Sequence, residues 1–152
     1  MVLQGQATVQ AFHMPVRGIR GATTAAENSA AAIIEATDEM LRAIMERNNV
    51  DLTEIASAFF TTTPDLTAEF PAYAARQLGW LAVPLLCGHE MNVLGALPRC
   101  VRVLIHLNTD LPQSAMRHVY LRDAVSLRRD LVDRYGQSDD PRGDAVTPNT
   151  PP

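Results

Sequence analysis

Three arginines stand out because they lie in apolar or helical surroundings rather than among acidic residues. Arg102 lies in RCVRVLIHL (99–107), Arg20 lies in GIRGATT (18–24), and Arg76 lies in a short predicted helix. The planar fork of a guanidinium matches the two oxygens of a carboxylate. Several arginines that converge on one pocket would therefore bind a substrate with more than one carboxylate. The alternative is that each arginine pairs with a local Asp or Glu.

Arg102 is the most informative of the three, because its segment has the alternation of a strand. One face would carry Val101, Val103, Ile105 and Leu107, and the other would carry Cys100, Arg102, Leu104 and His106. A charged guanidinium in so apolar a strand is costly to bury without a partner. No acid lies nearby in the sequence, which favours a functional role for Arg102 over a local ion pair.

Four further residues could contribute to a binding site, although each also has an ordinary interpretation. Glu90 follows a predicted strand in the loop CGHEMN, and Cys87 lies just before it. Tyr120 lies in RHVYL, and Phe70 lies in AEFPA. Glu90 could simply be solvated, and Cys87 and Tyr120 could be packing residues. Phe70 is expected to pack as a hydrophobic staple before the short helix.

Several kinds of catalytic and cofactor site are absent from the sequence. The chain has no HxxxH or CxxC metal pattern, no GxSxG elbow and no Walker or dinucleotide glycine loop. The histidines show no metal spacing, and each is expected to be a surface or satisfied core residue: His13, His89, His106 and His118. Two cysteines, Cys87 and Cys100, make neither a disulfide framework nor a zinc site. No metal and no cofactor are expected.

Composition bounds the class of protein. A chain of 152 residues with 47% hydrophobic residues fits one globular domain with a real core. A net charge of −4 gives no electrostatic footprint for nucleic acid. No apolar run approaches the roughly 18 residues of a membrane helix, and the N-terminal stretch lacks the basic and apolar regions of a signal peptide. We expect a reduced, cytoplasmic protein without nucleic-acid or membrane partners.

The two ends of the chain differ from its centre. Residues 1–14 are predicted to be a flexible N-terminal extension, with a mis-assigned start as the alternative. Residues 136–152 are rich in Pro, Asp, Gly and Thr and are predicted to be a disordered polar tail. The folded domain is therefore expected to span 15–135.

Helical and strand patterns alternate along this domain. Strands are predicted at 16–25, 57–63, 80–87 and 99–109, with one or two more in 116–127. The clearest helix is 27–49, a helical turn is expected in 50–56, a short helix is expected at 70–79, and a last helical turn at 128–136. Pro84 would place its strand at an edge of the sheet or at a bulge.

This order favours an α+β fold, in which a mixed β-sheet carries helices on one face. The other face of the sheet would then need cover from elsewhere. Oligomerisation would supply that cover.

Five blocks of the chain together resemble the AroH-type monofunctional chorismate mutases, over about residues 16–131. They are RGIRGATT, TPDLTAEFPAYAARQLGW, VPLLCGHEMNV, RCVRVLIHLNTD and RHVYLRDAVSLRRDL. The resemblance implies a homotrimer, a trimeric pseudo-α/β-barrel assembly with three active sites in clefts between neighbouring subunits. The substrate would be chorismate, rearranged to prephenate in the shikimate pathway of aromatic amino-acid biosynthesis.

This reaction is a Claisen-type pericyclic step, which needs no nucleophile, proton transfer or metal. The protein must hold a flexible dianion in a compact, chair-like conformer. It must also stabilise the negative charge that develops on the ether oxygen as the C–O bond breaks.

The resemblance assigns a role to each candidate residue. Arg102 would place its cation on the ether oxygen, Arg20 and Tyr120 would bind a substrate carboxylate, and Glu90, helped by Cys87, would accept the ring hydroxyl. Three further roles follow: Phe70 as an aromatic wall, Arg76 as a rim arginine, and Leu127 with Arg128 in a C-terminal segment over the site.

Two other functions stay open from the sequence. One is a non-catalytic trimeric binder of small acidic metabolites that uses the same arginine cleft, although no fused regulatory domain is visible. The other is an imine deaminase of the Rid type, which has a similar architecture. The blocks RGIRGATT and CGHEMNV fit the mutase better.

Overall fold

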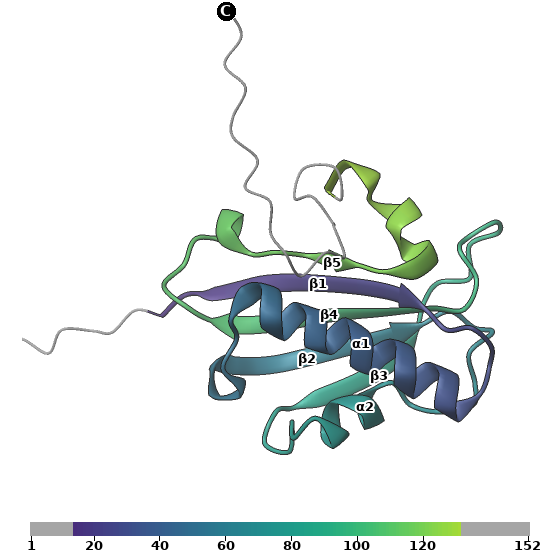
Figure 1. Ribbon diagram of the computed structural model, residues 1–152, viewed down its shortest axis with the longest axis horizontal. Helices are drawn as coiled ribbons and strands as arrows, with labels where there is room; N and C mark the ends of the chain where they lie inside the picture. The colour runs from purple at the N-terminus through teal and green to yellow at the C-terminus, as the bar shows by residue number, and fades with distance from the viewer. Residues whose placement is uncertain (1–13, 132–152) are drawn as a thin grey trace, which may run out of the picture.

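The computed structural model describes residues 14–131, which form a five-stranded sheet with two α-helices packed on one face (Figure 1). The strands and α-helices are β1 (Val16–Thr24), α1 (Ala30–Asn48), β2 (Ile55–Thr62), α2 (Ala72–Gln77), β3 (Leu85–His89), β4 (Cys100–Asn108) and β5 (Val119–Tyr120). Three short 3-10 helices complete it: η1 (Leu52–Glu54), η2 (Gln113–Ala115) and η3 (Arg122–Leu127). The predicted polar tail, and the predicted extension before Met14, lie outside the described residues.

The sheet is mixed, as the order of elements predicted. Its strand order is β3-β2-β4-β1-β5, so β4 is the central strand. β4 runs antiparallel to β1 and β2, whereas the edge strands β3 and β5 run parallel to their neighbours. β3 lies at an edge, as Pro84 indicated.

Helix α1 forms where the apolar spacing places it. Ser29 is the N-cap, and its side chain accepts a hydrogen bond from the backbone N–H of Ala32. The helix ends at Asn49, a residue whose left-handed backbone is typical of a C-cap. The side chains that recur at helical spacing in this segment are buried, namely Ile33, Thr37, Met40, Leu41 and Ile44, whereas Met45 is only partly buried.

The core lies between the two helices and the sheet. On β4, Val101, Val103, Ile105 and Leu107 all point into it and are at most 3% exposed. The alternation read in the sequence is therefore confirmed. Arg102 and its alternating neighbours lie on the opposite face of the sheet.

We call that opposite face the bare face. Neither α1 nor α2 lies over it, and among residues 14–131 only the segment around η3 covers its β1–β5 edge (Figure 1). Three large apolar side chains at its centre are exposed: Phe59 by 41%, Leu86 by 58% and Leu104 by 38%. They form one cross-strand row, because Phe59 pairs with Leu86 on one side and with Leu104 on the other.

Two predicted strands are wrong in extent. The segment 80–87 becomes a strand only at Leu85, because Pro84 has no N–H for the ladder and contributes its carbonyl alone, to the N–H of Ala58. The segment 116–127 holds only the two residues of β5 and then turns into η3.

The turn after β5 occurs at Arg122, whose φ of 51° ends the extended chain. The Arg122 side chain reaches across to α1, where its Nη2 lies 2.6 Å from Oε2 of Glu39. The same guanidinium donates to the carbonyl of Thr24 at the end of β1. These contacts tie η3 to both layers of the fold.

Gly21 allows α1 to pack closely against β1. A Cβ atom at this position would lie 2.7 Å from the Ile44 Cδ1 atom and 3.0 Å from Val103 Cγ1. Because Gly21 lies between Arg20 and Ala22 on β1, this contact also fixes the part of the strand that faces the other way.

We expect Gly21→Ala to destabilise the fold by about 1–3 kcal/mol, since the added methyl overpacks the core. Chemical denaturation measures the change. Gly18→Ala is the matched control on the same strand, because a Cβ there would meet only ordinary contacts, the nearest at 3.7 Å. Equal losses in the two variants would contradict this account of Gly21.

Candidate active site

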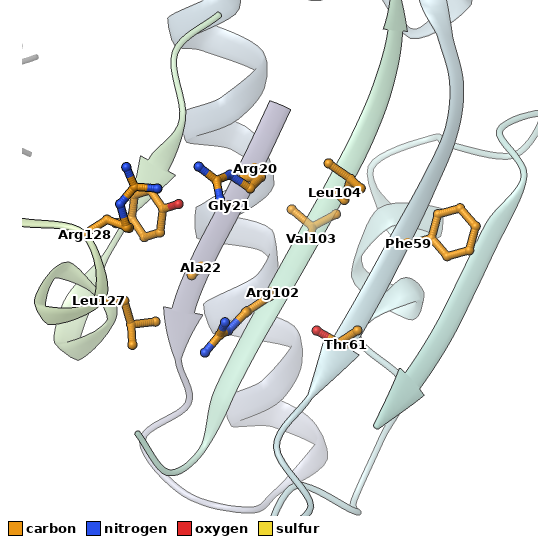
Figure 2. Close-up of a pocket in the computed structure, with 11 residues that line it drawn as sticks. Arg20, Gly21, Ala22, Phe59, Thr61, Arg102, Val103, Leu104, Leu127 and Arg128 are labelled. Atoms are coloured by element: carbon orange, nitrogen blue, oxygen red, sulfur yellow. The ribbon is translucent and has the colours of Figure 1, made fainter. Parts of the chain in front are cut away.

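A cavity of about 540 Å³ opens on the bare face, where β1, β2, β4 and the η3 segment meet (Figure 2). We call it the arginine cavity. Its lining residues are Arg20, Gly21, Ala22, Phe59, Thr61, Arg102, Val103, Leu104, Tyr120, Leu127 and Arg128. Five of the residues predicted from the sequence are therefore brought to one place: Arg20, Arg102, Tyr120, Leu127 and Arg128.

Strand register explains this convergence. Thr61, Arg102, Ala22 and Tyr120 form one cross-strand row through β2, β4, β1 and β5. Arg20 lies on the same face one step along β1, since alternate residues of a strand share a face. The small side chain of Ala22 separates Arg102 from Tyr120 and leaves space between them.

Arg102 faces the carboxylate of Glu90. Its buried Nε lies 3.0 Å from Oε1 of Glu90, an ion pair by distance without a directed Nε–H hydrogen bond. The Thr61 hydroxyl donates to the same carboxylate oxygen over 2.7 Å. The Arg102 side chain nevertheless remains 43% exposed, whereas that of Glu90 is 17% exposed. Glu90 thus holds the Nε end of the guanidinium and leaves the rest of the group accessible from the cavity.

Arg20 and Arg128 carry positive charge to the other end of the arginine cavity. In the described part of the chain, the guanidinium of Arg20 makes no hydrogen bond or ion pair. Arg128 forms a two-bond contact with Asp130, at 2.8 and 2.9 Å. Burial, followed by the charges of these two arginines, lowers the pKa of His118. A cavity with an unpaired arginine at this end is suited to an anionic ligand.

Tyr120 is held firmly at the side of the arginine cavity. It is only 5% exposed and packs with Ala22 and Ala124. Leu127 packs on the same cluster from the η3 segment. The segment therefore supplies an apolar wall beside the tyrosine.

A second cavity, of about 310 Å³, lies between the 66–71 loop and β3. Phe70 and Cys87 line it. Phe70 is 69% exposed, so the prediction that it packs as a staple is wrong; its ring projects from the loop instead of covering α2. Burial raises the pKa of the Cys87 thiol, which favours its neutral form.

Arg76 lines neither of these two cavities. It is exposed on α2, and its charge acts on Cys87. A single chain therefore separates the predicted residues into two groups. The first group is Arg20, Glu90, Arg102, Tyr120, Leu127 and Arg128. The second group is Phe70, Arg76 and Cys87.

Sequence reasoning missed Phe59, Thr61 and Leu104 as lining residues. The alternation of 99–107 had already placed Leu104 on the face of Arg102, and the alternation of 57–63 could have placed Phe59 and Thr61 together on one face of their strand. The contact between Thr61 and Glu90 had no such signal, because it joins the end of β2 to a loop 29 positions away.

The site as a whole is an electrostatic one. Within residues 14–131, no three His, Cys, Asp or Glu side chains gather in a group that could hold a metal ion. Arginines and a tyrosine line a partly apolar cavity on an α+β scaffold, and the Glu90 carboxylate pairs with Arg102 without lining the cavity itself. A cavity of this kind is suited to a small ligand with carboxylate groups, held by fixed charges.

Comparison with known proteins identifies the family. The family model for type I chorismate mutases matches residues 16–131. The chorismate mutase AroH of Thermus thermophilus is 54% identical over 117 residues, which cover 76% of this chain and 96% of that protein. The Bacillus subtilis chorismate mutase AroH is 44% identical over 119 residues, which cover 78% and 94%. A solved chorismate mutase from Clostridium thermocellum superposes with a TM-score of 0.71 at 43% identity, covering 72% of this chain and 97% of that one.

The chain belongs to the type I chorismate mutase family. It is therefore an isomerase that converts chorismate to prephenate in the synthesis of aromatic amino acids, as the sequence resemblance implied. Nothing in the comparisons supports the imine deaminase or the non-catalytic binder. In the described part of the chain, no helix has the length and apolar character needed to cross a membrane.

The hydroxyl of Thr61 should matter for turnover because it orients Glu90. We expect Thr61→Val to lower kcat/KM for chorismate about tenfold, since a hydrogen bond to a charged group contributes about 1.5 kcal/mol or more. Thr61→Ser retains the hydroxyl and is the matched control, which should stay close to wild type. Steady-state kinetics measure both, and equal activity of the two variants would rule out this role.

Proposed function

We propose that the arginine cavity is one half of the chorismate mutase active site, with Arg102 as the group that stabilises the transition state. The observation that carries the proposal is the convergence of Arg20, Arg102 and Tyr120 on one cavity. The rearrangement converts an enol ether into an α-keto acid without adding or removing atoms. Catalysis is therefore a matter of conformation and of charge at the breaking bond.

Arg102 is suited to the ether oxygen. It projects from the central strand, where the sheet holds its backbone on both sides. Glu90 fixes its Nε end, so the remaining guanidinium nitrogens are pre-oriented before substrate arrives. A fixed cation of this kind acts on charge that is larger in the transition state than in the substrate, which raises kcat.

Arg20, with Tyr120, is assigned to a substrate carboxylate. Its guanidinium has no partner in the described part of the chain, and the tyrosine hydroxyl can donate a further hydrogen bond. Leu127 and Arg128 lie over the same cavity and would help to exclude water from the bound dianion.

Glu90 is assigned two contacts. It already accepts from Thr61 and lies against Arg102, yet a carboxylate has about four acceptor positions. One of the remaining positions would accept a hydrogen bond from the ring hydroxyl of chorismate. Cys87 is assigned a contact near the same hydroxyl, as a neutral thiol.

The complete site is proposed to lie between two copies of the chain in a homotrimer. Two observations support this: Phe70, Arg76 and Cys87 are separated from the arginine cavity within one chain, and the bare face exposes a row of apolar side chains. Packing of bare faces around a threefold axis, as a pseudo-α/β-barrel, would bury that row and bring the two groups of residues together.

Replacing Arg102 should impair chemistry much more than stability. We expect Arg102→Gln to lower kcat by about 10²–10³-fold, by analogy with the loss of one oxyanion donor, on the order of 3 kcal/mol. The measurement is the loss of chorismate absorbance with prephenate as the product, alongside thermal unfolding. Arg42→Gln is the control, because Arg42 forms an exposed ion pair with Asp38 on the outer side of α1. Near-normal kcat in Arg102→Gln would refute the role.

Mixing two impaired variants tests the shared site. Arg102→Gln damages the first group of residues, and the double change Phe70→Ala with Arg76→Ala damages the second. If each site takes one group from each of two protomers, co-refolding the variants in equal amounts should restore about a quarter of the sites.

The control for this experiment is mixing without unfolding, which should leave both variants impaired. Sedimentation must show a trimer throughout. A co-refolded trimer with no recovered activity would show that both groups act within one chain.

A further inference from the structure

We propose that His118 is a positioning residue, which holds Arg20 in place through its Nδ1 atom and does so only as a neutral imidazole. The proposal rests on the assignment of Arg20 to a substrate carboxylate. It concerns a side chain that does not line the arginine cavity.

The geometry around β5 gives His118 its place. β5 pairs with β1 at only two positions, Gly21 with Val119 and Ala22 with Tyr120. One residue earlier on β1, the backbone N–H of Arg20 donates a 3.0 Å hydrogen bond to Nδ1 of His118. The imidazole thus continues the pairing beyond the end of the backbone ladder.

The donor in this hydrogen bond is unambiguous, because a backbone amide can only donate. Nδ1 must therefore carry no proton, and the hydrogen of the neutral ring must be on Nε2. Adding a proton to His118 would place it on Nδ1, facing the amide hydrogen of Arg20. The hydrogen bond would be lost and the two chain segments would separate.

Two charged groups face His118 from the elements packed against it, Arg20 on β1 and Arg128 just after η3. Burial is the larger cause and these two cations follow, and all three lower the pKa of His118 from its ordinary value of 6.5. The neutral, hydrogen-bonded form therefore predominates at neutral pH. It is lost as the pH falls through a value below 6.5.

Displacement of Arg20 should reduce binding more than chemistry. Arg20 contacts a carboxylate that is charged in both the substrate and the transition state, so its loss raises KM and leaves kcat nearly unchanged. A defect in folding alone would instead reduce the amount of active enzyme, which lowers the apparent kcat.

The test compares pH profiles of kcat/KM for the wild type, His118→Asn and His118→Ala, all in the full chain. An Asn carboxamide offers an acceptor oxygen near the place of Nδ1 and cannot be protonated in this range. We expect the wild-type profile to fall on the acid side at a pH below 6.5 and the His118→Asn profile to lack that fall. His118→Ala should show a KM about tenfold higher at neutral pH, from the loss of one hydrogen bond.

His106→Asn is the matched control. His106 lies on the bare face, on the same strand as Arg102. It contacts the hydroxyl of Ser57 and does not line the arginine cavity. This variant should retain the acid-side fall of the wild type. If His118→Asn kept that fall too, or if His118→Ala had a normal KM, the proposal would be overturned.

Nitrogen NMR of the imidazoles separates this proposal from the proposed function. A neutral His118 with its proton on Nε2 and a pKa below 6.5 supports the positioning role. A proton on Nδ1 of the neutral ring overturns it. Absence of turnover in the wild type counts against the proposed function alone, because the NMR experiment needs no activity.

Discussion

The ion pair between Arg102 and Glu90 is the contact on which the candidate site depends. Arg102 projects from a central strand whose other face is apolar. Its partly buried guanidinium needs a counter-charge close to the Nε atom. Glu90 supplies that charge from the loop after β3, and Thr61 orients the carboxylate. A cation held in this way keeps its outer nitrogens for a ligand. This arrangement suits a reaction in which the additional negative charge of the transition state develops on one ether oxygen.

The sequence predicted the mixed sheet, the long helix and the residues on the face of Arg102, because alternation and helical spacing are local signals. Val101, Val103 and Ile105 are buried on one face, as the alternation of their segment indicated. The arginine cavity could be anticipated in part for the same reason, since Arg20 and Arg102 follow the period of their own strands. Leu127 and Arg128, and the role of Tyr120, came from the family resemblance.

The parts that could not be predicted depend on contacts between distant segments. The partner of Arg102 is an acid from another strand's end, and nothing local in the sequence indicates it. The backbone of Arg122 turns the chain after β5. The sequence pattern of 116–127 did not indicate that turn, so the predicted strand was too long. Phe70 was expected to pack as a staple before the short helix, but its side chain is exposed and lines a second cavity.

The ion pair between Arg122 and Glu39 has a consequence for which substitutions this protein can accept during evolution. Glu39 points to solvent from the far layer of the fold, yet through Arg122 it determines where the wall of the arginine cavity begins. A substitution on the outer surface of α1 would ordinarily be neutral. Where α1 pairs with Arg122, closely through Glu39 and at 3.9 Å through Glu35, a substitution on the outside of the helix would alter the shape available to a ligand on the other side of the sheet.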